Sequence, residues 1–134
     1  PRRDETGNDI TVALLLSGRP EDARQSLAGA PEGLARDRLQ VLLGSPADAQ
    51  AASARLDADR SALGHFLRAE IAAYRGDSEL AFRELEAALS AHGIATSRLE
   101  FDLPHEIILS PFLRPLHADP RWATLRAGLA PPWT

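Results

Sequence analysis

The residues best suited to metal binding or proton transfer are four histidines, His65, His92, His105 and His117. Zinc sites on a helix commonly pair two histidines at i and i+4, as in the HExxH motif. No two of these histidines stand three or four residues apart, and the His105-Glu106 pair has no second histidine behind it. The sequence therefore predicts no metal site. A small enzyme or metal protein that uses His92, His105 and Glu106 is kept as the alternative.

Carboxylates and serines give no stronger signal for catalysis. Glu79, Glu84 and Glu86 fall on the expected solvent face of a helix, where a carboxyl pair would lack the burial that tunes a pKa. Several serines are present, but the chain has no Gly-x-Ser-x-Gly elbow and no glycine-rich phosphate loop. Cysteine is absent, which excludes thiol chemistry and disulfides. We therefore predict no catalytic residue, no enzyme activity and no cofactor.

Composition narrows the class of protein further. The net charge is −4 and all fifteen basic residues are arginines, without a clustered basic stretch, so direct nucleic-acid binding is not expected. No apolar run approaches the ~20 residues that cross a membrane, and no signal-peptide pattern opens the chain, so we expect a cytoplasmic protein. Alanine is abundant, aromatic residues are only 5 %, and no long β-branched alternation occurs, which favours an all-α fold.

The clearest helical pattern covers residues 63–89. Its first half places apolar side chains at steps of three and four, on one helix face: Leu63, Phe66, Leu67, Ile71 and Tyr74. Gly76 can take the left-handed conformation that ends a helix, and Asp77 can cap the next one. The second helix is expected from Ser78 to about residue 90, with Ala81 facing the first helix. Together they predict an antiparallel hairpin.

The same pattern occurs twice upstream. Small or apolar residues recur 5, 9 and 12 positions after each of Gly18, Gly44 and Gly76, which suits the inner face of a second helix. The glycines are 26 and 32 residues apart, whereas a tetratricopeptide repeat has a period of about 34. The units are therefore shortened, and a plain antiparallel helical bundle remains the alternative. Residues 1–8 are predicted to be a flexible segment and 9–134 a single domain.

The first helix and the C-terminal segment carry further signals. Asn8 or Asp9 can cap a helix that is apolar nearly all round and so needs cover on more than one side. Residues 105–110 are expected to form a short helix or turn. Asp119 and the following proline predict a final helix, whose Trp122 should close the open end of the structure.

Three stretches also resemble a known family: AAYRG at 72–76, AFRELEAAL at 81–89 and SPFLRPLHADPRWATL at 110–125. They are similar to the C-terminal tetratricopeptide-repeat (TPR) segment of bacterial proteins attached to transcriptional regulators, adenylate cyclases and protein kinases. The resemblance covers residues 60–129, about half of the chain. Ser110, Leu113 and His117 stand where that family usually has Asp, Phe and Arg.

The resemblance implies a short TPR-like solenoid of about three hairpins with a C-terminal capping helix. In such proteins the first helix of each unit lines a concave binding surface, which would place there Val12, Arg38, Phe66, Glu70 and Tyr74. Phe66 and Tyr74 could equally be core residues. A carboxylate clamp is not expected, because the chain has no lysine and Glu70 carries a like charge. We expect a regulatory module that binds a protein or peptide; a structural or dimerisation domain of a longer regulator is the remaining alternative, and self-association is left open.

Overall fold

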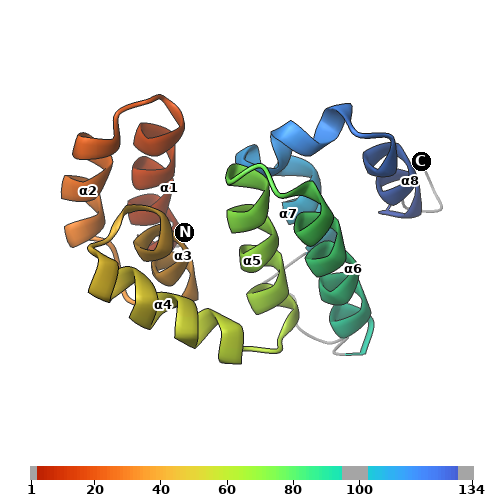
Figure 1. The fold of residues 1–134 in the computed structure, drawn as a ribbon, viewed down its shortest axis with the longest axis horizontal. Coiled ribbons are helices and arrows are strands. Elements are labelled where there is room, and N and C mark those ends of the chain that lie inside the picture. The colour runs from red at the N-terminus through yellow and green to blue at the C-terminus, as the bar shows by residue number, and fades with distance from the viewer. Residues whose placement is uncertain (1–2, 95–102, 130–134) are drawn as a thin grey trace. The chain divides into compact units, whose positions relative to one another are not determined.

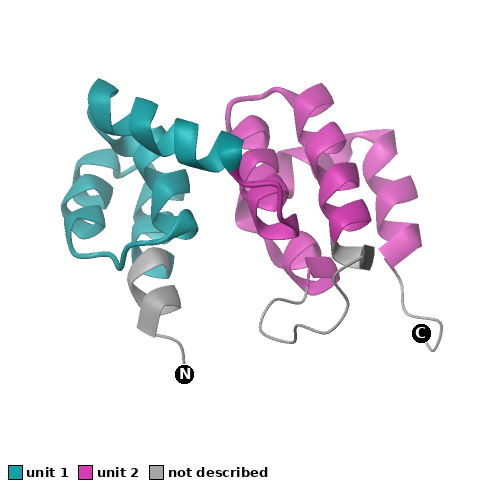
Figure 2. Cartoon of the chain, turned by 90° about the horizontal axis from the view of Figure 1, so that it is seen from below, with its two compact units in different colours: residues 1–58 teal, residues 59–134 magenta. Residues whose placement is uncertain are grey.

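The chain is helical throughout the residues that its computed structural model describes, 3–94 and 103–129, as the all-α prediction requires (Figure 1). It divides into two compact units, residues 1–58 and 59–134, and each is described here by itself (Figure 2). The prediction of one domain over residues 9–134 stays a prediction. None of the described helices has both the length and the apolar character that a membrane crossing requires.

Unit 1 consists of two helical hairpins. Its helices are α1 (Arg3–Leu16), α2 (Pro20–Ala28), α3 (Leu34–Leu43) and α4 (Pro46–Ala58). Helix α1 packs against α2 and α3 packs against α4, while α1 and α2 both also contact α3 (Figure 1). The α2–α3 and α1–α3 contacts join the two hairpins into one compact body.

Helix α1 differs from its prediction in where it begins and in how far its apolar side chains are covered. It begins at Arg3, so Asn8 and Asp9 lie inside the helix and do not cap it. Residues 3–8 thus belong to this helix, and the predicted flexibility of residues 1–8 stays a prediction. Leu15 is buried, but Ile10 and Leu16 stay exposed, because the neighbouring helices cover only one side of α1.

Two of the three glycine turns form as expected. Gly18 and Gly76 have φ angles of 81° and 84°, in the left-handed region that only glycine enters at no steric cost. In both turns the amide that follows the glycine bonds the carbonyl five residues before it, at 2.9 and 2.8 Å. This pattern is the Schellman motif, which satisfies carbonyls that the end of a helix leaves open.

The Gly44 turn differs from the other two. Gly44 has a φ of −73° and follows α3 directly, so this turn lacks the residue that precedes the glycine in the other two. On α4, Leu56 is buried as predicted, but Ala49 and Ser53 are only half-buried and the fully buried Ala52 was not predicted. The prediction for the inner face of α4 is therefore confirmed only in part, while that for α2 and α6 is confirmed.

Unit 2 is a hairpin covered by C-terminal elements. They are α5 (Ala62–Tyr74), α6 (Ser78–Ile94), α7 (Leu103–Leu109), the 3₁₀ helix η1 (Pro111–Ala118) and α8 (Pro120–Leu129). Helices α5 and α6 form the predicted hairpin, α7 contacts both of them, and η1 lies against α5 (Figure 1). Helix α6 runs to Ile94, past the end expected near residue 90. The fully buried side chains include those of Leu67, Leu85, Leu103, Ile107, Phe112 and Leu113.

Side-chain caps fix the starts of the unit 2 helices. Asp77 accepts from the Leu80 amide at 3.1 Å, and Asp119 accepts from the Arg121 amide at 2.8 Å, so both predicted caps are confirmed. Ser61 caps α5 by accepting from the amide three residues later, an interaction that the sequence did not single out.

Candidate functional site

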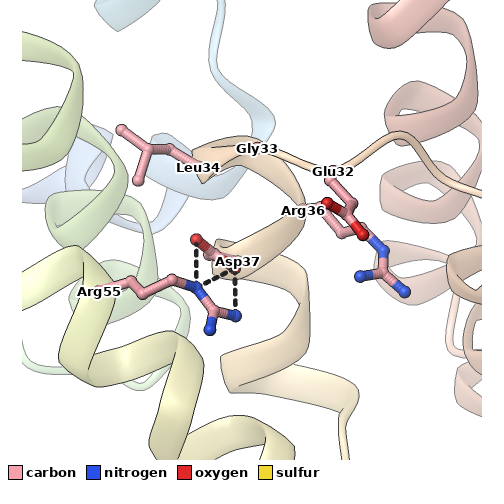
Figure 3. A pocket seen from close by; sticks show the side chains of 6 residues that line it. All are labelled: Glu32, Gly33, Leu34, Arg36, Asp37 and Arg55. Atoms are coloured by element: carbon pink, nitrogen blue, oxygen red, sulfur yellow. Dashed lines mark hydrogen bonds and ion pairs between the residues drawn. The ribbon is translucent and has the colours of Figure 1, made fainter.

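The described part of unit 1 has a surface pocket of about 430 Å³ beside the start of α3 (Figure 3). Its position follows from the α2–α3 connection, which brings the chain past the C-terminal half of α4. The lining residues are Glu32, Gly33, Leu34, Arg36, Asp37 and Arg55.

One wall of this pocket is an ion pair between α3 and α4. Arg55 donates through Nε to both Asp37 oxygens at 3.1 Å and through Nη2 to Oδ1 at 2.7 Å (Figure 3). The hydrogen bond to Asp37, followed by the negative charge of that carboxylate, raises the pKa of the Arg55 guanidinium. Asp37 is buried, and these bonds provide hydrogen-bond donors for its carboxylate.

The pocket has the chemistry of a binding surface rather than of an active site. Its lining contains neither a histidine nor a hydroxyl or thiol nucleophile. Its two guanidinium groups are balanced by two carboxylates, and both Asp37 oxygens are already engaged. Such a lining can hold a polar group but favours neither an anion nor a cation.

Unit 2 contains a partly buried charged cluster that joins α5 to α6. His65 Nδ1 lies 2.7 Å from Glu84 Oε1 and 2.8 Å from Arg68 Nη2, and Arg68 Nε lies 3.3 Å from the same Glu84 oxygen. His65 Nδ1 can donate to Glu84 or accept from Arg68, but it cannot do both. Glu84 was predicted to face solvent, which was wrong, since its side chain is only 17 % exposed; that of His65 is 14 % exposed.

The described side chains of His105 and His117 show no metal-binding arrangement. His105 and Glu106 lie side by side on α7, and His117 stacks on Trp122 with 4.3 Å between ring centroids. The side chain of His92 lies outside the described residues. Among the described residues, no three His, Cys, Asp or Glu side chains come together in a way that could hold a metal ion.

The five residues predicted to bind a partner are in different environments. Val12 is half-buried on α1, and Arg38, Phe66 and Glu70 are buried. Tyr74 alone among them is exposed, at 42 %. Three of the five, Phe66, Glu70 and Tyr74, follow one another along α5, while Val12 and Arg38 belong to the other unit.

Ser110, in the C-terminal segment, binds the side chain of Glu70. The Ser110 hydroxyl donates to Glu70 Oε2 at 2.6 Å, inside the unit, and the Glu70 residue is only 2 % exposed. A buried carboxylate needs such a donor, because leaving it without hydrogen bonds would cost several kcal/mol. Ser110 thereby fixes the junction of α7 and η1 against the middle of α5.

This junction creates an exposed apolar surface. Tyr74 lies one helical turn, about 6 Å, beyond Glu70, and its ring meets the buried Phe112 ring edge-on at 5.9 Å. Leu109, which precedes Ser110, is 60 % exposed. Among the described residues of unit 2, only Tyr74 and Leu109 are large apolar residues with such exposure. We call them the Tyr74–Leu109 surface. The sequence pointed to Tyr74 but not to Leu109, because residues 105–110 were predicted only as a short helix or turn, without a buried or an exposed face.

Comparison with known proteins adds no assignment: no protein-family model matches the sequence, and no curated protein or solved structure matches it significantly.

Proposed function

We propose that the chain is a protein–protein interaction module built from TPR-like helical hairpins, cytoplasmic and regulatory in role, and that it binds a protein or peptide. The observation that carries this proposal is the Tyr74–Leu109 surface. It consists of two exposed apolar side chains. The Tyr74–Phe112 ring contact and the Glu70–Ser110 hydrogen bond hold the neighbouring backbone in place. Tyrosine is one of the residue types that most often dominate the binding energy of protein interfaces.

A selection from displayed random 16-residue peptides, using the purified chain as bait, tests this proposal. We expect enriched peptides that bind saturably and that bind the Tyr74→Ser and Leu109→Ser variants at least tenfold more weakly. The Thr124→Ser variant, altered at an exposed site on α8, should bind them like the wild type. Failure to enrich any saturable peptide, or peptides indifferent to both variants, would overturn the proposal.

Self-association through α1 is a second candidate, favoured by a specific observation. Ile10 and Leu16 are exposed large apolar residues, and the exposed Ala13 lies midway between them. At this spacing the three lie near one helix face, and the small central residue permits a close approach of another helix. Sedimentation velocity of the Ile10→Ser/Leu16→Ser variant tests this candidate. A concentration-dependent dimer that the double substitution abolishes would support it, and a monomeric wild type would exclude it.

A further inference from the structure

The surroundings of the Tyr74–Leu109 surface indicate what kind of partner it fits. Arg75 follows Tyr74 directly, and Arg114 lies on η1 two residues after Phe112, the ring that Tyr74 contacts. Both arginines are exposed. Neither side chain makes a hydrogen bond or ion pair within the described residues. Two exposed arginines without a partner among the described residues therefore stand within a few residues of the Tyr74–Phe112 contact.

The acidic groups close to this surface are engaged inside unit 2. Glu70 is buried and accepts from Ser110, and the Asp77 carboxylate accepts from the Leu80 amide at the start of α6. Glu106, on α7, is half-buried and also has an interaction partner. Asp77 is exposed and keeps its negative charge, so the exposed charges next to the apolar pair in the chain are two arginines and one carboxylate.

Other arginines of unit 2 are used differently. Arg68 bonds Glu84, and Arg121 bonds Asp119 and Glu79 while its guanidinium stacks on the Phe82 ring at 4.6 Å. These side chains hold helices together. Arg75 and Arg114 have no such role in the described structure, although the chain as a whole carries a net charge of −4.

We propose that the Tyr74–Leu109 surface receives an acidic segment of a partner protein that carries large apolar side chains among its carboxylates. The apolar side chains would cover Tyr74 and Leu109, and the carboxylates would accept from Arg75 and Arg114 in the forked geometry that guanidinium groups favour. Opposite charges at the edge of an apolar contact set the choice of partner and speed association more than they add affinity. This inference rests on the proposed function and specifies the chemistry of its ligand.

The peptides enriched in the selection above provide the probe. Each is synthesised with a fluorescent label and in a second form whose Asp and Glu are replaced by Asn and Gln. Binding is measured by anisotropy at about 0.05 and 0.5 M salt, since exposed charge pairs are screened over this range. The variants are Arg75→Glu and Arg114→Glu, and the matched controls are Arg83→Glu and Arg126→Glu, at exposed arginines that also lack a partner in the described residues.

We expect enriched peptides to be acidic and to lose roughly three- to tenfold in affinity with each of the first two reversals, but less than twofold with the controls. The amide forms should bind more weakly, and the differences should shrink at high salt. Peptides that require Tyr74 and Leu109 but are not acidic, or that ignore the reversals at 75 and 114, would overturn this inference and leave the proposed function standing. Peptides indifferent to Tyr74 and Leu109 would overturn both. Equal losses from all four reversals would mean that only the overall charge matters, which also contradicts the inference.

Discussion

Ser110 donates its hydroxyl proton to the buried carboxylate of Glu70, 2.6 Å away and forty residues earlier in the chain. The bond joins the middle of α5 to the point where α7 ends and η1 begins. It thereby orients the two residues that flank it, Tyr74 one turn further along α5 and Leu109 just before the serine. A buried polar contact thus supports an exposed apolar surface.

Removing this hydroxyl should destabilise unit 2. Ser110→Ala leaves Glu70 with one donor fewer in a buried position, so we expect the free energy of unfolding to fall by about 1–3 kcal/mol. Urea denaturation followed by circular dichroism measures the change. Ser90→Ala, at an exposed position on α6, is the matched control and should have little effect. Equal, small losses from the two variants would show that Glu70 does not depend on Ser110.

The hairpins could be predicted from the sequence because their signals are local. A left-handed glycine, an aspartate cap and a proline in the first helical turn act within a few residues, and so Gly76, Asp77 and Asp119 behave as expected. The Gly44 turn could not be predicted in the same way. There a Cβ atom would clash with Gln40 Oε1 and lie 2.7 Å from the Gln40 carbonyl oxygen, so glycine is needed for space and not for a positive φ.

The candidate site was less predictable, because it depends on contacts between distant residues. The helical pattern placed Phe66, Glu70 and Tyr74 on one helix, but it could not show that the C-terminal elements would pack against that helix. There Ser110 donates to Glu70, and the Phe112 ring contacts Tyr74. Leu109 is exposed, since its neighbour is held inward. The contact between Glu84 and His65 likewise depends on how α5 and α6 pack together, which the helical pattern of each helix does not show.

The interface of α6 with the rest of unit 2 should not tolerate a larger side chain at Ala81. This residue is completely buried on the inner face of α6. We expect Ala81→Leu to lower the free energy of unfolding by about 1–3 kcal/mol, because the added atoms have no space without backbone shifts. Ala123→Leu adds the same atoms at an exposed position of α8 and should be nearly neutral. A melting temperature unchanged by Ala81→Leu would contradict the packing of this hairpin.

Trp122 should contribute more to stability than any other residue of α8. It is buried, and its ring stacks on His117 while α8 packs against η1. Truncation of a buried aromatic residue typically costs about 3–5 kcal/mol, and we expect a loss of that size for Trp122→Ala, together with self-association through the apolar surface it exposes. Thermal melting and size-exclusion chromatography measure the two effects. Trp133→Ala, outside the described residues, should cost little; an effect equal to that of Trp122→Ala would contradict the special role of Trp122.

The cap of α8 should make stability depend on acid pH in a specific way. The Arg121 side chain, and then the Arg121 backbone amide, donate to the Asp119 carboxylate and hold its pKa below the ordinary value of 3.8. Because the folded pKa lies below the unfolded one, the unfolded state takes up the proton first as the pH falls. The carboxylate therefore contributes stability that is fully present above the ordinary pKa and is lost as the pH falls through the folded value.

Asp119→Asn separates the charge from the cap, because asparagine keeps a side-chain oxygen that can accept from the Arg121 amide. We expect the wild type to melt at a higher temperature than this variant above about pH 5, and the difference to shrink steadily towards pH 2. Glu86→Gln removes an exposed carboxylate of α6 that has no partner in the described residues, so its difference from the wild type should change little over the same range. A difference between the wild type and Asp119→Asn that is constant with pH would mean that the cap stabilises α8 through its geometry alone.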